Sequence, residues 1–172
     1  MNERLRLKAI DQDDLQIMAA CLQDALIPLR EMAFMVDDHR FMAAFDRFQW
    51  ERSGSTENAD PLTICQSVLS VDNVQEVKYR GLDPDIDGVK LELLTMLVKP
   101  VDDSGFDLVL VFAGDIAIKL RVSELCLTLE DFSDPWTAKL APKHDLPDIS
   151  SKRDTPSGSE TPSGPKTPSG ND

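Results

Sequence analysis

Paired cysteines and long apolar runs are both missing from this chain of 172 residues. Cys21, Cys65 and Cys126 are odd in number and far apart. This argues against a disulfide framework or a Cys-x-x-Cys metal site, and for reduced thiols in a cytoplasm. The longest apolar runs, LLTMLV and LVLVFA, are too short to span a bilayer. The first residues, MNERLRLKAI, do not resemble a secretion signal. We therefore expect a cytoplasmic protein with no membrane partner.

Motifs of the common catalytic classes are missing as well. The chain contains no GxGxxG or GxxxxGK(S/T) phosphate loop, no GxSxG nucleophile, and no HExxH or paired-cysteine zinc signature. His39 and His144 are its only histidines, and they lie far apart in the chain. These absences disfavour nucleotide-dependent, hydrolytic and zinc-dependent enzymes, so we expect no cofactor and no metal site. The sequence leans away from an enzyme without deciding the question.

Basic residues are scarce. The chain has 18 Lys and Arg against 31 Asp and Glu, a net charge of -13 at neutral pH. Bases and acids nearly cancel from Pro147 onward, so the acidity belongs to the preceding part. A field of this sign repels phosphate backbones, and the sequence shows no basic patch. We therefore do not expect a nucleic acid partner.

The chain ends in a repeat that contains almost no apolar residues. From Thr155 the sequence reads TPSGSE, TPSGPK and TPSGND. Such a segment cannot bury enough apolar surface to offset the entropy of ordering its backbone. We predict one folded domain over residues 1–146 and a disordered tail over residues 147–172. An inert solubilising extension is favoured for the tail over a phosphoacceptor or docking segment.

The N-terminal region predicts a short strand from Leu5 to Ile10 and then one amphipathic helix. Asp11 is placed to cap this helix, and acidic residues follow in its first turn, where the helix dipole favours them. Apolar residues recur at helical spacing from Asp14 to Leu26, and Pro28 ends the pattern.

After Pro28, apolar residues recur at every second position, which predicts β-strands. One hairpin turns at residues 37–40 and another at residues 114–115. Further strands are predicted at residues 62–71, 74–80 and 89–98. Residues 125–132 fit a strand or a short helix, with the strand favoured. The fold class is therefore α+β: a mostly antiparallel, strongly curved sheet, a roll or barrel of about seven strands, with one N-terminal helix.

The stretch VDDHRFMAAFDRFQWE concentrates charged and aromatic residues. Its apolar residues change parity between Phe45 and Phe48, which predicts a β-bulge near Asp46-Arg47. Residues 37–39 could form a proton-transfer group around a histidine, but turn chemistry is the stronger interpretation and we assign no catalytic residue.

Four residues are our candidates for ligand binding, because bulges can aim side chains at ligands and arginines can hold an anion. They are Asp46, Arg47, Trp50 and Arg80. A structural ion pair is the stronger interpretation of the two residues at the bulge.

Five segments resemble one bacterial family. They read LKAIDQDDLQIMAACLQDAL, FMVDDHRFMAAFDRFQWE, VKYRGLD, VFAGDIAIKLRV and LEDFSDPW. In order and spacing, the chain from Leu5 to His144 resembles the alphaproteobacterial family catalogued as domain of unknown function 2948. The resemblance implies a cytosolic single-domain protein, with no activity, cofactor or catalytic residue to transfer. The repeat tail lies outside the family pattern.

Two functions remain open. The favoured one is a non-enzymatic binding or regulatory module, in which a sheet edge or the groove beside the helix receives another protein. The alternative is a binding protein or enzyme for an anionic metabolite, with a pocket near Arg47, Trp50 and Arg80. The sequence specifies neither the partner or ligand nor the oligomeric state.

Overall fold

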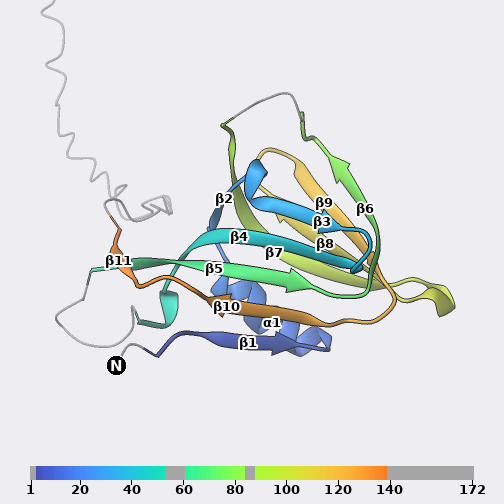
Figure 1. Cartoon of the computed structure of the whole chain (residues 1–172), viewed down its shortest axis with the longest axis horizontal. Helices are drawn as coiled ribbons and strands as arrows, with labels where there is room; N and C mark the ends of the chain where they lie inside the picture. The colour runs from blue at the N-terminus through green and yellow to red at the C-terminus, as the bar shows by residue number, and fades with distance from the viewer. Residues whose placement is uncertain (1–2, 53–60, 84–87, 139–172) are drawn as a thin grey trace, which may run out of the picture. The chain divides into compact units, whose positions relative to one another are not determined.

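Eleven β-strands and one α-helix form the part of the chain that the computed structural model describes, which is residues 3–52, 61–83 and 88–138 (Figure 1). These residues belong to one compact unit, Met1–Pro142. The repeat tail lies outside the described residues, so the predicted domain boundary and the predicted disorder stay predictions.

The strands are β1 Arg6–Ala9, β2 Leu26–Pro28, β3 Met32–Met35, β4 Arg40–Phe48, β5 Thr63–Val71, β6 Val74–Arg80, β7 Lys90–Pro100, β8 Phe106–Phe112, β9 Ile116–Val122, β10 Leu127–Asp131 and β11 Trp136–Thr137. The helix is α1 Gln12–Cys21, and the short 3-10 helices are η1 Leu29–Glu31, η2 Trp50–Arg52 and η3 Asp102–Ser104.

The strands form one sheet in the order β1-β10-β5-β4-β2-β7-β8-β9-β6, with β3 added beside β4 and β11 beside β5. Every pairing in it is antiparallel. The α+β class with a mostly antiparallel sheet is therefore confirmed. The strongly curved roll or barrel of about seven strands is wrong. The sheet has eleven strands, and β1 and β6 end its path without pairing to each other. A two-residue period shows which side chains face the core and carries no information about closure.

The helix α1 begins directly after the predicted capping residue, Asp11. The backbone N–H of Asp14 donates to Oδ1 of Asp11 at 2.8 Å, which satisfies one of the free N–H groups of the first turn. The apolar side chains buried along and just after the helix are Leu15, Met18, Ala19 and Leu22. The helix ends at Cys21, short of the predicted end at Leu26. Leu26 instead belongs to β2, where it pairs with both β4 and β7.

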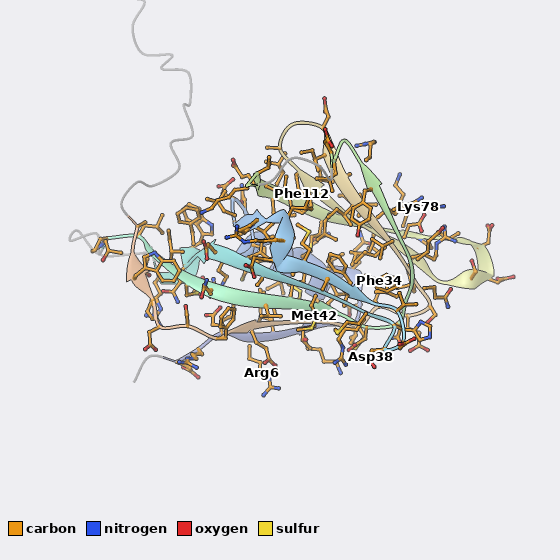
Figure 2. All side chains as sticks on the ribbon, turned by 45° about the horizontal axis from the view of Figure 1, so that its top comes forward. Arg6, Phe34, Asp38, Met42, Lys78 and Phe112 are labelled. Atoms are coloured by element: carbon orange, nitrogen blue, oxygen red, sulfur yellow. The ribbon has the colours of Figure 1, made fainter. Side chains whose placement is uncertain are left out.

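The hydrophobic core lies between α1 and the inward faces of the strands. Buried side chains from the central strands include Phe41, Ala43 and Phe45 of β4, Leu69 and Val71 of β5, and Leu127 and Leu129 of β10. Figure 2 shows Phe112 of β8 turned toward other side chains, whereas Arg6 and Lys78 point away from the ribbon. Each fully buried Phe or Leu side chain stabilises the fold by about 1.5–3 kcal/mol relative to exposure.

The β-bulge predicted near Asp46-Arg47 is wrong. β4 pairs with β5 residue by residue from Phe41 to Phe48 without a register shift. The inward parity that includes Phe45 simply continues to Arg47, which is also completely buried. Phe48 faces the other way and is buried as well, with its ring centroid 5.4 Å from that of Trp50. The apparent change of parity arises because a charged residue occupies an inward position.

The apolar pattern of the sequence did not identify the shortest strands and left one other strand undecided. Residues 127–131 form the strand β10, so the strand alternative for this region is the correct one. β2 and β11 were not predicted, because three and two residues are too few to show a period. The hairpins β3–β4 and β8–β9 occur where their turns were predicted.

Candidate functional site

A polar cluster replaces the apolar core where β4, β5 and β10 run side by side. Arg47 of β4 is directly opposite Cys65 of β5, and Ser67 of β5 is opposite Asp131 of β10. All four residues are buried. Since consecutive inward positions on neighbouring strands are close, the pairing itself brings these side chains together.

Two carboxylates hold the guanidinium of Arg47. Nε and Nη2 of Arg47 donate to the two oxygens of Asp131 at 2.9 and 2.8 Å. Nη1 and Nη2 donate to the two oxygens of Glu51 at 3.1 and 2.8 Å. The Ser67 hydroxyl and the Phe48 carbonyl oxygen accept further bonds from Arg47 at 3.1 and 3.3 Å. This is the bidentate geometry in which arginine–carboxylate pairs are strongest.

Hydrogen bonds between Arg47 and its carboxylate partners favour the charged forms of Arg47 and Asp131. Burial alone would lower the pKa of Arg47, but hydrogen bonds to Asp131 and Glu51 outweigh it and raise that pKa. Burial alone would raise the pKa of Asp131, but hydrogen bonds from Arg47 and Ser67 lower it below its ordinary value. The predicted structural ion pair at Arg47 is thus present, but its partners are Asp131 and Glu51 and not Asp46.

The nearby thiols are poor nucleophiles. Burial raises the pKa of Cys65 to about 11, although the charge of Arg47 opposes the rise. Burial, and next the negative charge of Glu51, raise the pKa of Cys21. No disulfide involves any of the three cysteines. A raised pKa lowers the fraction of reactive thiolate at neutral pH, so these two thiols are weak nucleophiles.

The other candidate residues lie elsewhere. Asp46 faces the outer side of β4 and lines a hollow of about 370 Å³ together with Arg30 and Lys90. The indole Nε1 of Trp50 donates to the backbone oxygen of Gln23 at 3.0 Å, which ties η2 to the end of α1.

Arg80 is exposed at the end of β6 and pairs there with Ala117 of β9. Strands β2, β7, β8 and β9 separate β6 from β4 in the sheet order. Arg47 and Trp50 are near each other in the sequence, but Arg80 lies on a strand that is distant from both. The side chain of Arg47 is also completely buried.

The turn that carries His39 has a structural role. His39 has a positive φ of 50°, and its Nδ1 lies 3.3 Å from the carbonyl oxygen of Val74. The Val74 N–H donates to the His39 carbonyl oxygen at 2.8 Å, and Arg40 Nε donates to Asp72 at 2.6 Å. These contacts fasten the β3–β4 turn to the corner between β5 and β6.

A groove between α1 and β7 is the second candidate site. It encloses about 470 Å³ and is lined by residues of both elements: Gln12, Leu15, Gln16, Ala19, Ala20, Gln23 and residues 94–98. Its lining contains no charged side chain. Leu94 and Leu97 of β7 are 44% and 48% exposed, so they present apolar surface at this groove.

Among the described strands, none pairs with the edge of β7 that lies beside this groove. β7 pairs with β2 over Lys90–Glu92 and with β8 over Leu93–Pro100, with a register shift between Leu93 and Thr95 that leaves Leu94 without a partner residue in β8. Backbone bonds join Leu93 to Ala25 and Asp24, which closes the β2 side only up to Leu93. Beyond that point, β8 is the only strand that pairs with β7 within the described ranges. The sequence analysis named a sheet edge or the groove beside the helix as a docking surface, but no local pattern identified β7 as the strand beside that groove.

The described part of the chain contains neither a metal-binding cluster nor a helix that could cross a membrane. Over residues 3–52, 61–83 and 88–138, no group of three or more His, Cys, Asp or Glu is arranged to hold a metal ion. The helix α1 has ten residues and falls short of the length and apolarity of a bilayer-spanning helix, as do the other described helices.

Comparison with protein families matches residues 5–144 to the family described as "Protein of unknown function (DUF2948)". The match covers most of the chain and the whole of the sheet. No curated protein and no solved structure matches the chain. The chain therefore belongs to the DUF2948 family.

Proposed function

We propose that this protein is a non-enzymatic binding module of the cytoplasm, and that it receives an extended segment of a partner protein in the groove between α1 and β7. The single observation that carries the proposal is the open edge of β7 beyond Leu93, which runs along a groove lined by apolar and amide side chains.

The edge offers backbone hydrogen bonds to an added strand. A strand with a partner on one side only has a row of free N–H and C=O groups on the other. The edge from Leu94 to Pro100 is as long as an ordinary strand of about five or six residues. Extended peptides bind such edges by main-chain pairing, and alternate side chains enter neighbouring pockets.

The groove suits a segment with apolar residues at alternate positions. Leu94 and Leu97 supply exposed apolar surface on β7, and α1 supplies apolar side chains below it. Gln12, Gln16 and Gln23 add amide donors and acceptors along the opposite wall. These groups can bond to the outer edge of a docked backbone without requiring a charged partner.

The negative charge of the chain favours a partner segment with basic residues on either side of its docked part. A net charge of -13 attracts cations over a distance of about 8–10 Å at physiological ionic strength. The groove itself is uncharged, so the docked residues are apolar and the basic residues lie beside them. The partner segment is therefore an extended apolar stretch flanked by Lys or Arg.

The test is a peptide selection followed by affinity measurements on a groove variant and a matched control variant. Twelve-residue peptides are selected from a random library on the intact chain, and their affinities are measured for wild type, Leu97→Asp and Val36→Asp. Val36 is 63% exposed and lies outside the groove, so it is the matched control. We expect Leu97→Asp to weaken binding by about tenfold or more, because burying a leucine contributes about 1.5–3 kcal/mol. Val36→Asp should leave the affinity unchanged.

Amide hydrogen exchange identifies the mode of binding. An added strand should slow exchange in β7 beyond Leu93, since its free N–H groups become bonded. Protection confined to another edge, such as β6, would refute the proposal. So would selected peptides that bind Leu97→Asp as tightly as wild type.

A further inference from the structure

Glu51 differs from the other partners of Arg47 because it reaches the solvent. The side chain of Arg47 is 0% exposed and that of Asp131 is 2% exposed, whereas that of Glu51 is 38% exposed. Asp131 also accepts bonds from the Ser67 hydroxyl and the Leu5 N–H. Arg47 is the only hydrogen-bond partner of the Glu51 carboxylate among the described residues. Asp131 is thus fixed from several sides, and Glu51 is held by Arg47 alone.

The position of Glu51 in the chain makes its side chain replaceable. It lies in η2, a 3-10 helix of three residues that follows β4 and belongs to no strand. Turning this side chain outward breaks no sheet pairing and no core contact of β4. The guanidinium of Arg47 would then present Nη1 and Nη2 to an oxyanion from solvent, while Asp131 keeps Nε and Nη2.

A hollow with an unusual charge lies directly outside Glu51. It encloses about 460 Å³ and is lined by Glu3, Arg4, Leu5, Arg6, Glu51 and Arg52. Three arginines therefore gather at one opening of a chain whose net charge is -13. Figure 2 shows the side chain of Arg6, one of these three arginines, pointing away from the ribbon.

These arginines are only weakly engaged. Arg6 pairs with Glu130 at 2.8 Å, but its side chain is 81% exposed. Arg4 pairs with Asp134 at 3.3 Å with both side chains more than half exposed. Among the described residues, the hydrogen bond of the Arg52 side chain runs from Nη2 to the backbone oxygen of Glu3, at 3.4 Å. Exposed pairs of this kind contribute little to stability, so a bound anion can replace them at little cost.

We propose that this hollow binds a small dicarboxylate, and that the Glu51 carboxylate is an internal occupant which the ligand displaces. One ligand carboxylate takes the place of Glu51 on the fork of Arg47. The second lies at the mouth, where Arg52 and Arg4 supply positive charge. A planar carboxylate fits because Glu51 already shows that this group binds Arg47 through two parallel bonds. The site is independent of the groove between α1 and β7.

The exchange leaves the charge around Arg47 unchanged, because one ligand carboxylate replaces that of Glu51, whose side chain is 38% exposed. The second ligand carboxylate then lies among the arginines at the mouth. A monocarboxylate can bind Arg47, but it has no second carboxylate to interact with Arg52.

The experiment measures succinate, acetate and phosphate binding by calorimetry at constant ionic strength, on the full chain. Glu51→Ala should bind succinate about tenfold or more tightly than wild type, because a tethered competitor acts at millimolar effective concentration. Adding Arg52→Gln to Glu51→Ala should weaken succinate but leave acetate unchanged. Glu31→Ala is the matched control, since Glu31 pairs with Arg30 on another part of the surface.

Thermal unfolding of the same variants guards against a folding artefact. Succinate should raise the unfolding midpoint of Glu51→Ala more than chloride of equal ionic strength does. The shift that succinate causes in Glu31→Ala should equal the shift in wild type. The proposal is overturned if Glu51→Ala gains no affinity for succinate, or if Arg52→Gln has no effect on it. Equal binding of phosphate with the same dependence on Arg52 would overturn the dicarboxylate assignment.

Discussion

Removing the carboxylate of Asp131 should destabilise the fold far more than removing a surface acid. Asp131→Ala leaves the fully buried guanidinium of Arg47 with Glu51 as its only carboxylate partner. The Ser67 hydroxyl and the Leu5 N–H lose their acceptor at the same time. Breaking a buried pair in this way costs about 3–5 kcal/mol, because a desolvated charge loses its compensation.

The lower end of that range applies here. Glu51 keeps two hydrogen bonds to Arg47, so the charge is not left wholly unpaired. We therefore expect a loss of about 3 kcal/mol, a large share of the roughly 5–15 kcal/mol that stabilises a typical domain. The double variant Arg47→Met/Asp131→Leu leaves no buried charge at this cluster, and it should be more stable than Asp131→Ala. In that variant, Glu51 can turn into solvent.

Urea unfolding followed by circular dichroism measures these changes, provided that the slope stays constant between variants. Glu130→Ala is the matched control, because Glu130 pairs with Arg6 on the surface and should contribute at most about 1 kcal/mol. If Asp131→Ala lost no more stability than Glu130→Ala, the cluster would not be a stabilising unit. A double variant less stable than Asp131→Ala would contradict the desolvation argument.

Three further predictions concern pH, thiols and turns. Since the pKa of Asp131 is lower in the folded chain than its ordinary value of 3.8, its ionised form stabilises the fold above that pH. This contribution is lost as the pH falls through the folded pKa, so urea midpoints should drop below about pH 4 less steeply in Asp131→Asn than in wild type. Cys65 should resist Ellman's reagent at pH 8 in the native state while Cys126 reacts, and equal rates would contradict the burial of Cys65. Gly105→Ala should destabilise the chain well beyond Gly114→Ala in thermal unfolding: both glycines have positive φ, but a Cβ at Gly105 would meet a backbone oxygen at 2.1 Å, whereas one at Gly114 meets nothing within 4 Å.

Local chemistry made several elements predictable. Asp11 capped a helix because its short side chain reaches the free N–H of Asp14. The hairpins around residues 37–40 and 114–115 followed from turn residues between alternating apolar strands. Phe41 and Phe45 were assigned to one face because side chains alternate along a strand. Each of these conclusions involves residues that are neighbours in the chain.

The candidate site depended on contacts that local pattern does not contain. Arg47 seemed to mark a bulge because an inward charged residue breaks the apolar alternation. Its partner Asp131 is 84 residues away, so only the pairing of β4, β5 and β10 shows why the position tolerates a charge. Arg80 was grouped with Arg47 on residue type alone, and the sheet order placed it on a distant strand.

The sequence by itself determined the class of the fold, the start of the helix, the main strands and the acidic character of the chain, because these depend on composition and on short-range periodicity. The tertiary structure decided where α1 ends, that the sheet stays open, which carboxylates hold Arg47, and that β7 leaves an edge exposed beyond Leu93. Those outcomes depend on which distant segments meet. Strand order and the burial of a paired charge are set by the free energy of the whole packed chain, which no single stretch of residues encodes.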